Sequence, residues 1–78
     1  MIFPNPFHDR ATVQLTGGTS IADGEFKAYD IYGKMLILKH IQNSDNIHLE
    51  RKDLPAGVYF YSLEDHHKIL FRGKFMIK

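Results

Sequence analysis

The sequence predicts an all-β domain, a compact antiparallel β-sandwich of six or seven strands. The strongest observation is the alternation of apolar and other residues from 69 to 78, which keeps a period of two over ten residues. Short β-prone segments also recur along the chain, and clusters of Gly, Pro, Asn and Asp separate them. No segment carries a sustained apolar stripe with helical spacing.

The first regular strand is expected at residues 11–15, after an extended lead-in at residues 1–10. Two X-Pro steps in the lead-in disfavour helical backbone angles there. Alternation within the strand places Val13 and Leu15 on one face. The Gly-Gly pair within residues 16–20 then indicates a flexible break.

Two strands joined by a turn are expected next. Residues 25–31 alternate, with Phe26 on the inward face. Asp30 and Gly33 stand at the first and fourth positions of a turn, where these residue types are common. Residues 34–41 are apolar on both faces, which predicts a central strand of a sheet.

Two further strands are expected at residues 46–50 and 58–63. The first alternates, with Ile47 and Leu49 inward. The second is rich in aromatic and β-branched residues, and it follows a predicted tight turn at residues 54–57. Proline stands at the second position of this turn and glycine at the last, which suits turn geometry.

The last strand is the clearest, and Gly73 in its middle is expected at a bulge or a kink. Residues 65–67 turn the chain into it. A total of six or seven strands suits an immunoglobulin-like sandwich, with an exposed terminal strand as an edge. The inward face of the last strand should hold Ile69, Phe71, Gly73, Phe75 and Ile77.

Length and composition allow one small domain and exclude several protein classes. Seventy-eight residues make a single domain, and hydrophobic residues, at 44%, suffice for a core. The absence of cysteine excludes disulfides and thiolate zinc sites. No apolar run approaches the ~20 residues of a membrane-spanning helix, and no signal peptide is recognisable. An export signal, if the protein has one, is therefore expected upstream in a longer chain.

Five histidines raise the question of a metal site. The neighbours His66 and His67 would point to opposite faces of a strand. His40 and His48 would face each other if residues 42–45 closed a hairpin between two strands. A third ligand is lacking in either case, so we expect no metal and no cofactor.

No set of catalytic residues is visible in the chain. No serine lies in a G-x-S-x-G elbow, and the acidic residues are scattered over predicted turns. Gly17-Gly18 lacks the lysine of a phosphate-binding loop. A sandwich of this size also leaves little volume for an enclosed pocket, so we expect no enzyme.

A stacking platform for nucleic acid would need Tyr59 and Tyr61 beside Arg72 and Lys74. The net charge is only +1, and aromatic residues at strand spacing commonly belong to a core. We therefore expect no nucleic-acid partner.

A small module that binds glycans or protein partners is the alternative function. It would use exposed tyrosines, with Tyr29, Tyr32 and Tyr59 as candidates. Cross-strand packing of the same tyrosines is the competing interpretation.

The charge is uneven along the chain, because no acidic side chain follows Asp65. In one interpretation, these cations only keep an exposed edge strand soluble. In the other, they form a basic segment that a receptor recognises. The cations concerned are Lys68, Arg72, Lys74 and Lys78.

Five motifs occur in a characteristic order. They are Pro-Asn-Pro-Phe at 4–7, Thr-Val-Gln-Leu at 12–15, Tyr-Asp-Ile-Tyr-Gly-Lys at 29–34, Leu-Pro-Ala-Gly-Val-Tyr-Phe-Tyr at 54–61 and Gly-Lys-Phe-Met-Ile-Lys at 73–78. In this order the chain resembles the type A C-terminal sorting domain of proteins exported by the type IX (Por) secretion system of Bacteroidota. The resemblance covers essentially all 78 residues.

The resemblance implies a non-enzymatic secretion signal with an immunoglobulin-like sandwich fold. Residues 1–78 would form one sorting domain, with a cargo domain upstream. The cargo would pass through the periplasm and the outer-membrane translocon to the cell surface or the medium. A surface sortase usually removes such a domain and often couples the cargo to an anionic lipopolysaccharide. An exposed edge strand would also allow self-association.

The resemblance also assigns candidate recognition residues. They are Pro4, Asn5 and Pro6, then Asp30, Gly33 and Lys34, then Leu54, Gly57 and Tyr59, and finally Lys74, Ile77 and Lys78. Turn geometry also accounts for the two glycines, and packing accounts for the tyrosine. The terminal lysines have the weakest structural reason, so we expect recognition at the basic end of the chain.

Overall fold

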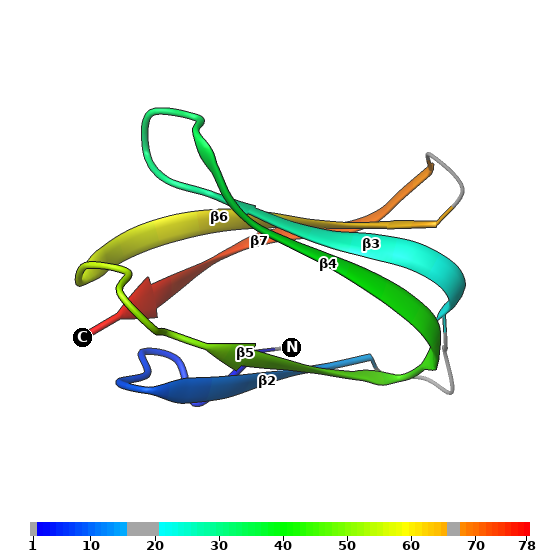
Figure 1. Ribbon diagram of the computed structural model, residues 1–78, viewed down its shortest axis with the longest axis horizontal. Helices are drawn as coiled ribbons and strands as arrows, with labels where there is room; N and C mark the ends of the chain where they lie inside the picture. The colour runs from blue at the N-terminus through cyan, green and yellow to red at the C-terminus, as the bar shows by residue number, and fades with distance from the viewer. Residues whose placement is uncertain (1, 16–20, 66–67) are drawn as a thin grey trace.

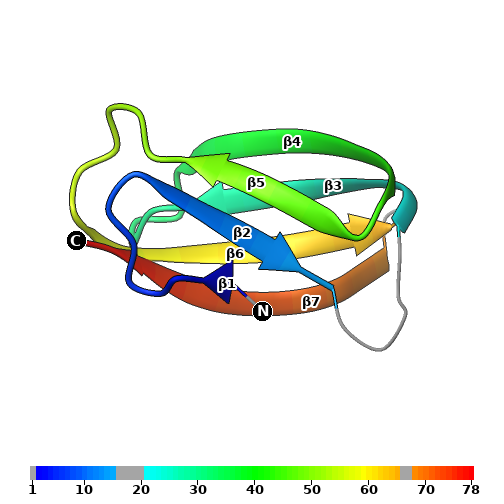
Figure 2. The ribbon, with the colours of Figure 1, turned by 90° about the horizontal axis from the view of Figure 1, so that it is seen from below.

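The computed structural model describes residues 2–15, 21–65 and 68–78, and they form seven strands and no helix. The strands make two antiparallel sheets, ordered β1-β2-β5 and β4-β3-β6-β7, that pack face to face (Figures 1 and 2). The predicted all-β sandwich is therefore confirmed. The strands are β1 (Ile2–Phe3), β2 (Arg10–Gln14), β3 (Ile21–Tyr29), β4 (Met35–Ser44), β5 (Asn46–Glu50), β6 (Gly57–Asp65) and β7 (Lys68–Ile77).

The predicted break at 16–20 and the residues at the centre of the predicted turn, 66–67, lie outside the described residues. The described residues contain no helical segment with the length and hydrophobicity that a membrane span requires.

The strand order is that of an immunoglobulin-like sandwich. In the usual A-to-G scheme, β1, β2 and β5 take the places of A, B and E, and β3, β6 and β7 those of C, F and G. Strand β4 extends the second sheet beside β3. A tyrosine corner is also present, because the Tyr59 hydroxyl near the start of β6 donates to the carbonyl of Pro55, four residues upstream.

The core lies between the sheets and is built from the inward residues of each alternating strand. Phe26, Leu63 and Ile21 have no exposed surface. Complete burial of such a side chain contributes roughly 1.5–3 kcal/mol. The predicted inward residues of the strands at 11–15 and 46–50 are buried as expected: Val13, Leu15, Ile47 and Leu49.

The expectation of a central strand at residues 34–41 is wrong. Strand β4 lies at the edge of the four-stranded sheet and pairs with β3. Its inward face carries Ile37 and Ile41, which pack on the core. Its outward face leaves Met35 and Leu38 exposed by 46% and 57%. The apolar character of both faces therefore reflects an exposed apolar surface rather than a central position.

The hairpin that would bring His40 and His48 together does not form. After β4 the chain crosses to the other sheet, where β5 pairs with β2. His40 lies opposite Glu25, and His48 lies opposite Thr12. The chain crosses because β4 pairs with β3 in one sheet and β5 pairs with β2 in the other. Each of the two strands buries an isoleucine, Ile41 or Ile47, between the sheets.

The predicted tight turn at residues 54–57 is also wrong. The chain reverses just before it, where the Leu54 amide donates to the Arg51 carbonyl at 3.1 Å and Lys52 takes a φ of 53°. Residues 54–57 instead lead into β6. Gly57 has a φ of 153°, a conformation that side-chain-bearing residues rarely adopt.

Strand β7 keeps its predicted alternation only in its second half. Phe75 and Ile77 are buried, whereas Phe71 and Ile69 are 41% and 42% exposed. The register of this strand pair shifts between Leu63 and Glu64 of β6, which lie opposite Phe71 and Ile69 of β7. The shift therefore precedes Gly73 along β7.

Gly73 therefore marks neither a bulge nor a register shift, because it pairs regularly with Tyr61. A Cβ atom at Gly73 would lie 2.8 Å from the Tyr61 ring. The glycine makes room for this tyrosine.

Candidate functional site

Four segments that carry or adjoin the motifs lie at one end of the sandwich, on the left in Figures 1 and 2. They are the lead-in at 4–8, the β3–β4 turn at 30–34, the β5–β6 connection with the first residue of β6 at 51–57, and the last residues of β7 with the residue after it at 76–78. Their meeting follows from the antiparallel pairing, because β3 and β7 end where β6 begins. We call this region the motif end.

The lead-in is bonded to the end of β7. The Phe7 amide donates to the Met76 carbonyl at 3.0 Å, and the Lys78 amide donates to the Phe7 carbonyl at 2.9 Å. The Met76 amide donates to Oδ1 of Asn5 at 2.9 Å. The Phe7 ring is buried, with its centroid 5.7 Å from that of Phe75. The opening motif thus covers the edge of the terminal motif.

Arg51 ties three segments together, and the sequence motifs did not predict this role. Its Nε donates to the Leu54 carbonyl at 2.9 Å, and its Nη1 donates to the carbonyls of Lys78 and His8 at 2.7 and 3.3 Å. A guanidinium suits this role because its donors are held in a rigid plane. No sequence signal distinguishes Arg51 from a solvated turn cation, because its acceptors are all backbone carbonyls.

The predicted turn from Asp30 to Lys34 is confirmed. Oδ1 of Asp30 accepts hydrogen bonds from the amides of Tyr32 and Lys34, both at 2.9 Å. Gly33 has a φ of 85°, and its amide donates to the Asp30 carbonyl at 3.1 Å. This rigid turn holds Ile31 and Tyr32 outward, with 63% and 88% of their surface exposed.

The motif at residues 54–61 serves the fold. Tyr59 is 3% exposed, and its ring stacks on Phe75 with centroids 5.5 Å apart. Burial raises the pKa of the Tyr59 phenol above its ordinary value, since the charged form loses hydration. Leu54 packs against the core. The sequence-based expectation that Tyr59 could be an exposed glycan contact is therefore wrong.

The terminal motif divides into a buried and an exposed part. Ile77 is 1% exposed and belongs to the core, so its side chain is out of reach of a partner. The candidate recognition residues whose side chains stand exposed are Pro4, Asn5, Pro6, Lys34, Lys74 and Lys78. Half of this exposed set is cationic. The buried and hydrogen-bonded motif residues hold it in place.

The nucleic-acid platform is not formed. Tyr59 and Tyr61 pair with Phe75 and Gly73 on the inward face of the sheet. Lys74 falls between those inward positions and Arg72 directly precedes Gly73, so both side chains point outward. Tyrosines and cations therefore lie on opposite faces.

No site for a metal ion was found in the described part of the chain, where no three His, Cys, Asp or Glu side chains come together. His40 instead contacts Asp23, with Nε2 and Oδ1 2.8 Å apart. The pair His66 and His67 lies outside the described residues.

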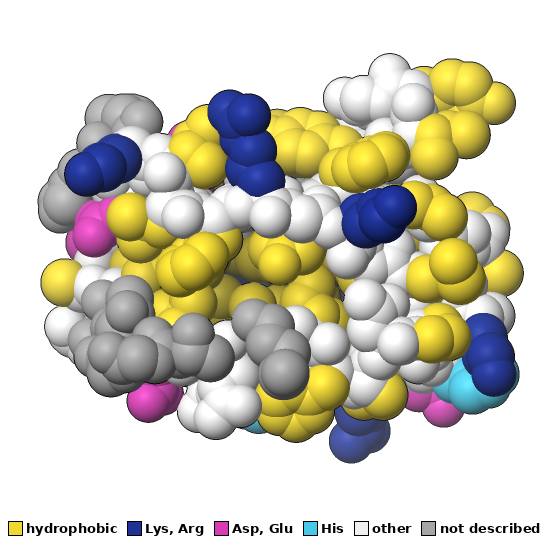
Figure 3. All heavy atoms as spheres, turned by 180° about the vertical axis from the view of Figure 1, so that it is seen from behind, with side chains coloured by type: hydrophobic (Ala, Val, Ile, Leu, Met, Phe, Trp, Pro, Cys, Tyr) yellow, Lys and Arg dark blue, Asp and Glu magenta, His cyan; other side chains and the backbone are white. Residues whose placement is uncertain are grey.

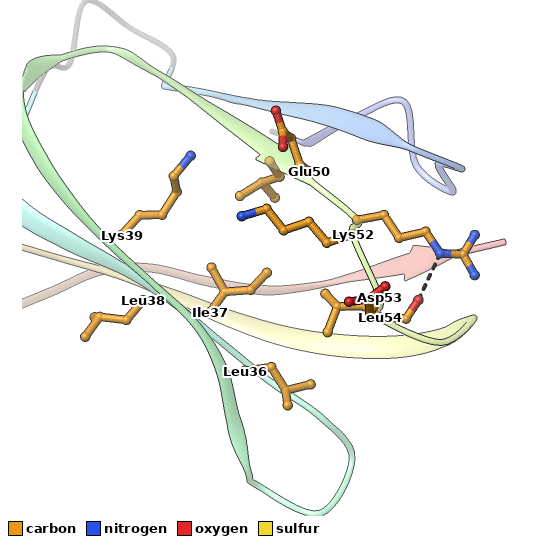
Figure 4. A pocket seen from close by; sticks show the side chains of 10 residues that line it. Leu36, Ile37, Leu38, Lys39, Glu50, Lys52, Asp53 and Leu54 are labelled. Carbon is orange, nitrogen blue, oxygen red and sulfur yellow. Dashed lines mark hydrogen bonds between the residues drawn. The ribbon is translucent and has the colours of Figure 1, made fainter.

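A groove of about 510 Å³ runs between β4 and β5, the edge strands of the two sheets on one side of the sandwich (Figure 4). Nζ of Lys39 reaches across from β4 and donates to the His48 carbonyl of β5 at 2.6 Å. Leucine and isoleucine side chains line the groove beside charges of both signs. The lining residues are Leu36, Ile37, Leu38, Lys39, Leu49, Glu50, Arg51, Lys52, Asp53 and Leu54.

A small ion-pair cluster lies on the outward face of the four-stranded sheet. Nζ of Lys27 lies 3.1 Å from Glu64 and 4.0 Å from Glu25. The hydrogen bond with Glu64 raises the pKa of Lys27, against an opposing effect of desolvation. Both acidic side chains are therefore engaged by a lysine of their own sheet.

Comparison with known proteins identifies the family. A family model described as the secretion system C-terminal sorting domain matches residues 1–78. No match was found among curated proteins. The match spans the whole chain, and the fold is the sandwich that the resemblance implied. The chain therefore belongs to the family of C-terminal sorting domains of the type IX secretion system.

Proposed function

We propose that this domain directs an upstream cargo protein through the outer membrane by the type IX system, and that a surface sortase then removes it. The observation that carries the proposal is the family match over the whole chain. The gathering of segments from four of the five motifs at one end of the sandwich supports it. In this proposal residues 1–78 act as one sorting domain, and the cargo passes through the periplasm to the cell surface or the medium.

The proposed partners are the outer-membrane translocon and the sortase complex. The exposed cations of the motifs, Lys34, Lys74 and Lys78, would make the contacts. The remaining motif residues would act indirectly, by holding these lysines in fixed positions. Asn5 is an example, since its side chain bonds to Met76 of β7. Arg51, which lies outside the motifs, would act in the same way through its bond to the Lys78 carbonyl.

A fusion of residues 1–78 to a periplasmic reporter tests the proposal in a bacterium that has the type IX system. We expect the reporter at the cell surface or in the medium. Removal of residues 74–78 should leave it inside the cell. Export without those residues, or retention of the intact fusion, would contradict the proposal.

Single substitutions locate the contact within β7. Lys74→Ala and Lys78→Ala should each lower export, whereas Lys68→Ala serves as a matched control on the same strand outside the motif. Equal losses from all three would mean that only net charge matters. The sortase step is read separately, from the size of the surface-exposed reporter.

A binding module for glycans or protein partners is the second candidate. It is favoured by the exposed Tyr32 at the tip of a rigid turn and by the groove between β4 and β5. A glycan array and a pull-down with the isolated domain test it, and silence in both would remove it. Self-association through an edge strand is measured by sedimentation of the same sample.

A further inference from the structure

Among the described residues, the side of the sandwich between β1 and β7 is open along part of its length. Figure 3 shows apolar side chains lining a hollow between the sheets, with Lys and Arg side chains standing beside it. Strand β1 has only two residues, so it covers little of this side. The lead-in covers the end of β7 through the bridge from Phe7 to Ile77. The middle of β7 has no neighbour on this side among the described strands.

The backbone of this stretch points toward the open side. The amide and carbonyl of Met76 bind the lead-in, so they face away from β6. Backbone groups of every second residue in a strand point the same way. The pairing of β6 with β7 runs without a register shift from Ile77 back to Phe71. The amides and carbonyls of Arg72 and Lys74 therefore also face away from β6, and no described strand or loop pairs with them.

The side chains give this edge two different faces. Arg72 and Lys74 are exposed on the outward face, about 7 Å apart along the strand. The ion pairs among described residues involve Lys27 and His40, and neither Arg72 nor Lys74 takes part. On the inward face, Phe71 pairs with a buried leucine yet remains 41% exposed.

The opposite side of the sandwich is less suited to an added strand. There Lys39 already bridges β4 and β5, and the groove carries charges of both signs. A second copy of the chain is also disfavoured at β7. Antiparallel pairing of two such edges would set the cations of one near those of the other, and like charges placed across a strand pair are destabilising.

We infer that the β7 edge at Arg72 and Lys74 receives an extended segment of a partner protein by strand addition. The segment carries acidic side chains on the outward face and apolar side chains on the inward face. Backbone hydrogen bonds supply the affinity in this mode, and alternate side chains supply the specificity. The inference rests on the proposed function, because the partner belongs to the export machinery.

Proline at position 74 separates backbone pairing from charge. Lys74→Pro removes both the outward amide and the cation, whereas Lys74→Ala removes only the cation. An edge strand tolerates proline where its amide faces away from the sheet. We expect export of a reporter fused to residues 1–78 to fall by about tenfold more with proline than with alanine, since one lost hydrogen bond weakens binding by roughly that factor.

Folding is checked by cooperative thermal melting of each purified variant. If Lys74→Pro does not fold, the double variant Arg72→Glu/Lys74→Glu replaces it, because it keeps both amides and reverses both charges. That variant should lose export while melting like wild type. Normal export of a folded double variant would overturn the inference.

Other outcomes discriminate between occupants. If the wild-type fusion stays inside the cell, the proposed function itself fails. If wild type is exported and a folded Lys74→Pro equals Lys74→Ala, strand addition is overturned and the proposed function stands. Equal loss in those two variants would indicate an anionic surface, such as lipopolysaccharide, that binds the cations alone. A dimer of the isolated domain that Lys74→Pro disrupts would make a second copy the occupant, which also overturns the inference.

Discussion

Arg51 offers the sharpest test of how the motif end is held together. Arg51→Ala removes three hydrogen bonds to carbonyls of Leu54, His8 and Lys78, two of them at 2.9 Å or less. A bond from a charged donor contributes about 1.5–3 kcal/mol, and the half-exposed position of Arg51 argues for values nearer 1 kcal/mol each. We therefore expect the free energy of unfolding to fall by about 2–3 kcal/mol.

For a domain of this length, that loss corresponds to a fall in Tm of roughly 10–20 °C. Circular dichroism melts of wild type, Arg51→Ala and Arg51→Lys measure it. Lysine keeps the charge but lacks the planar donors, so it should recover only part of the loss. A fall in Tm below about 3 °C for Arg51→Ala would refute the reasoning, because it would mean that the three bonds add little beyond solvation.

Three further substitutions test other contacts, each followed by urea unfolding. Gly73→Ala should lower stability by about 1–3 kcal/mol, because its Cβ would meet the Tyr61 ring, and the loss should shrink in a Tyr61→Leu background. Asp30→Ala should cost about 1–2 kcal/mol through two lost turn bonds, and an unchanged midpoint would contradict the role of its carboxylate. Tyr59→Phe should cost about 1 kcal/mol near neutral pH through the lost bond to Pro55. Burial raises the pKa of Tyr59, so its contribution is complete below pH 10 and is lost as pH rises through the folded-state pKa. Wild type should therefore lose stability above about pH 10 more steeply than Tyr59→Phe, and parallel pH profiles would speak against this.

Local patterns in the sequence were sufficient to predict the strands in which one face is apolar and the other polar. Residues 11–15 and 46–50 bury their apolar positions as predicted, because alternation has a period that matches the pleat. The turn at Asp30 was equally predictable, since its hydrogen bonds all lie within five residues. The motif residues themselves were visible in the chain, and their order identified the family.

Pairing between distant segments decided the features that local patterns did not predict. The apolar faces of β4 do not reveal whether a strand lies beside it, so its edge position required the sheet order. The same holds for Gly73, whose neighbour is the ring of Tyr61 in the next strand. Arg51 could not be singled out, because its acceptors are backbone carbonyls that every residue possesses.

The sequence by itself determined the fold class and the family, because both depend on residue types at fixed spacing along one chain. Only the tertiary structure decided which motif residues a partner can reach. Tyr59 and Ile77 are removed into the core, whereas Lys74 and Lys78 stand exposed. The physical reason is that accessibility and free backbone edges depend on what packs alongside, and the neighbours of β7 come from the opposite end of the chain and from β6.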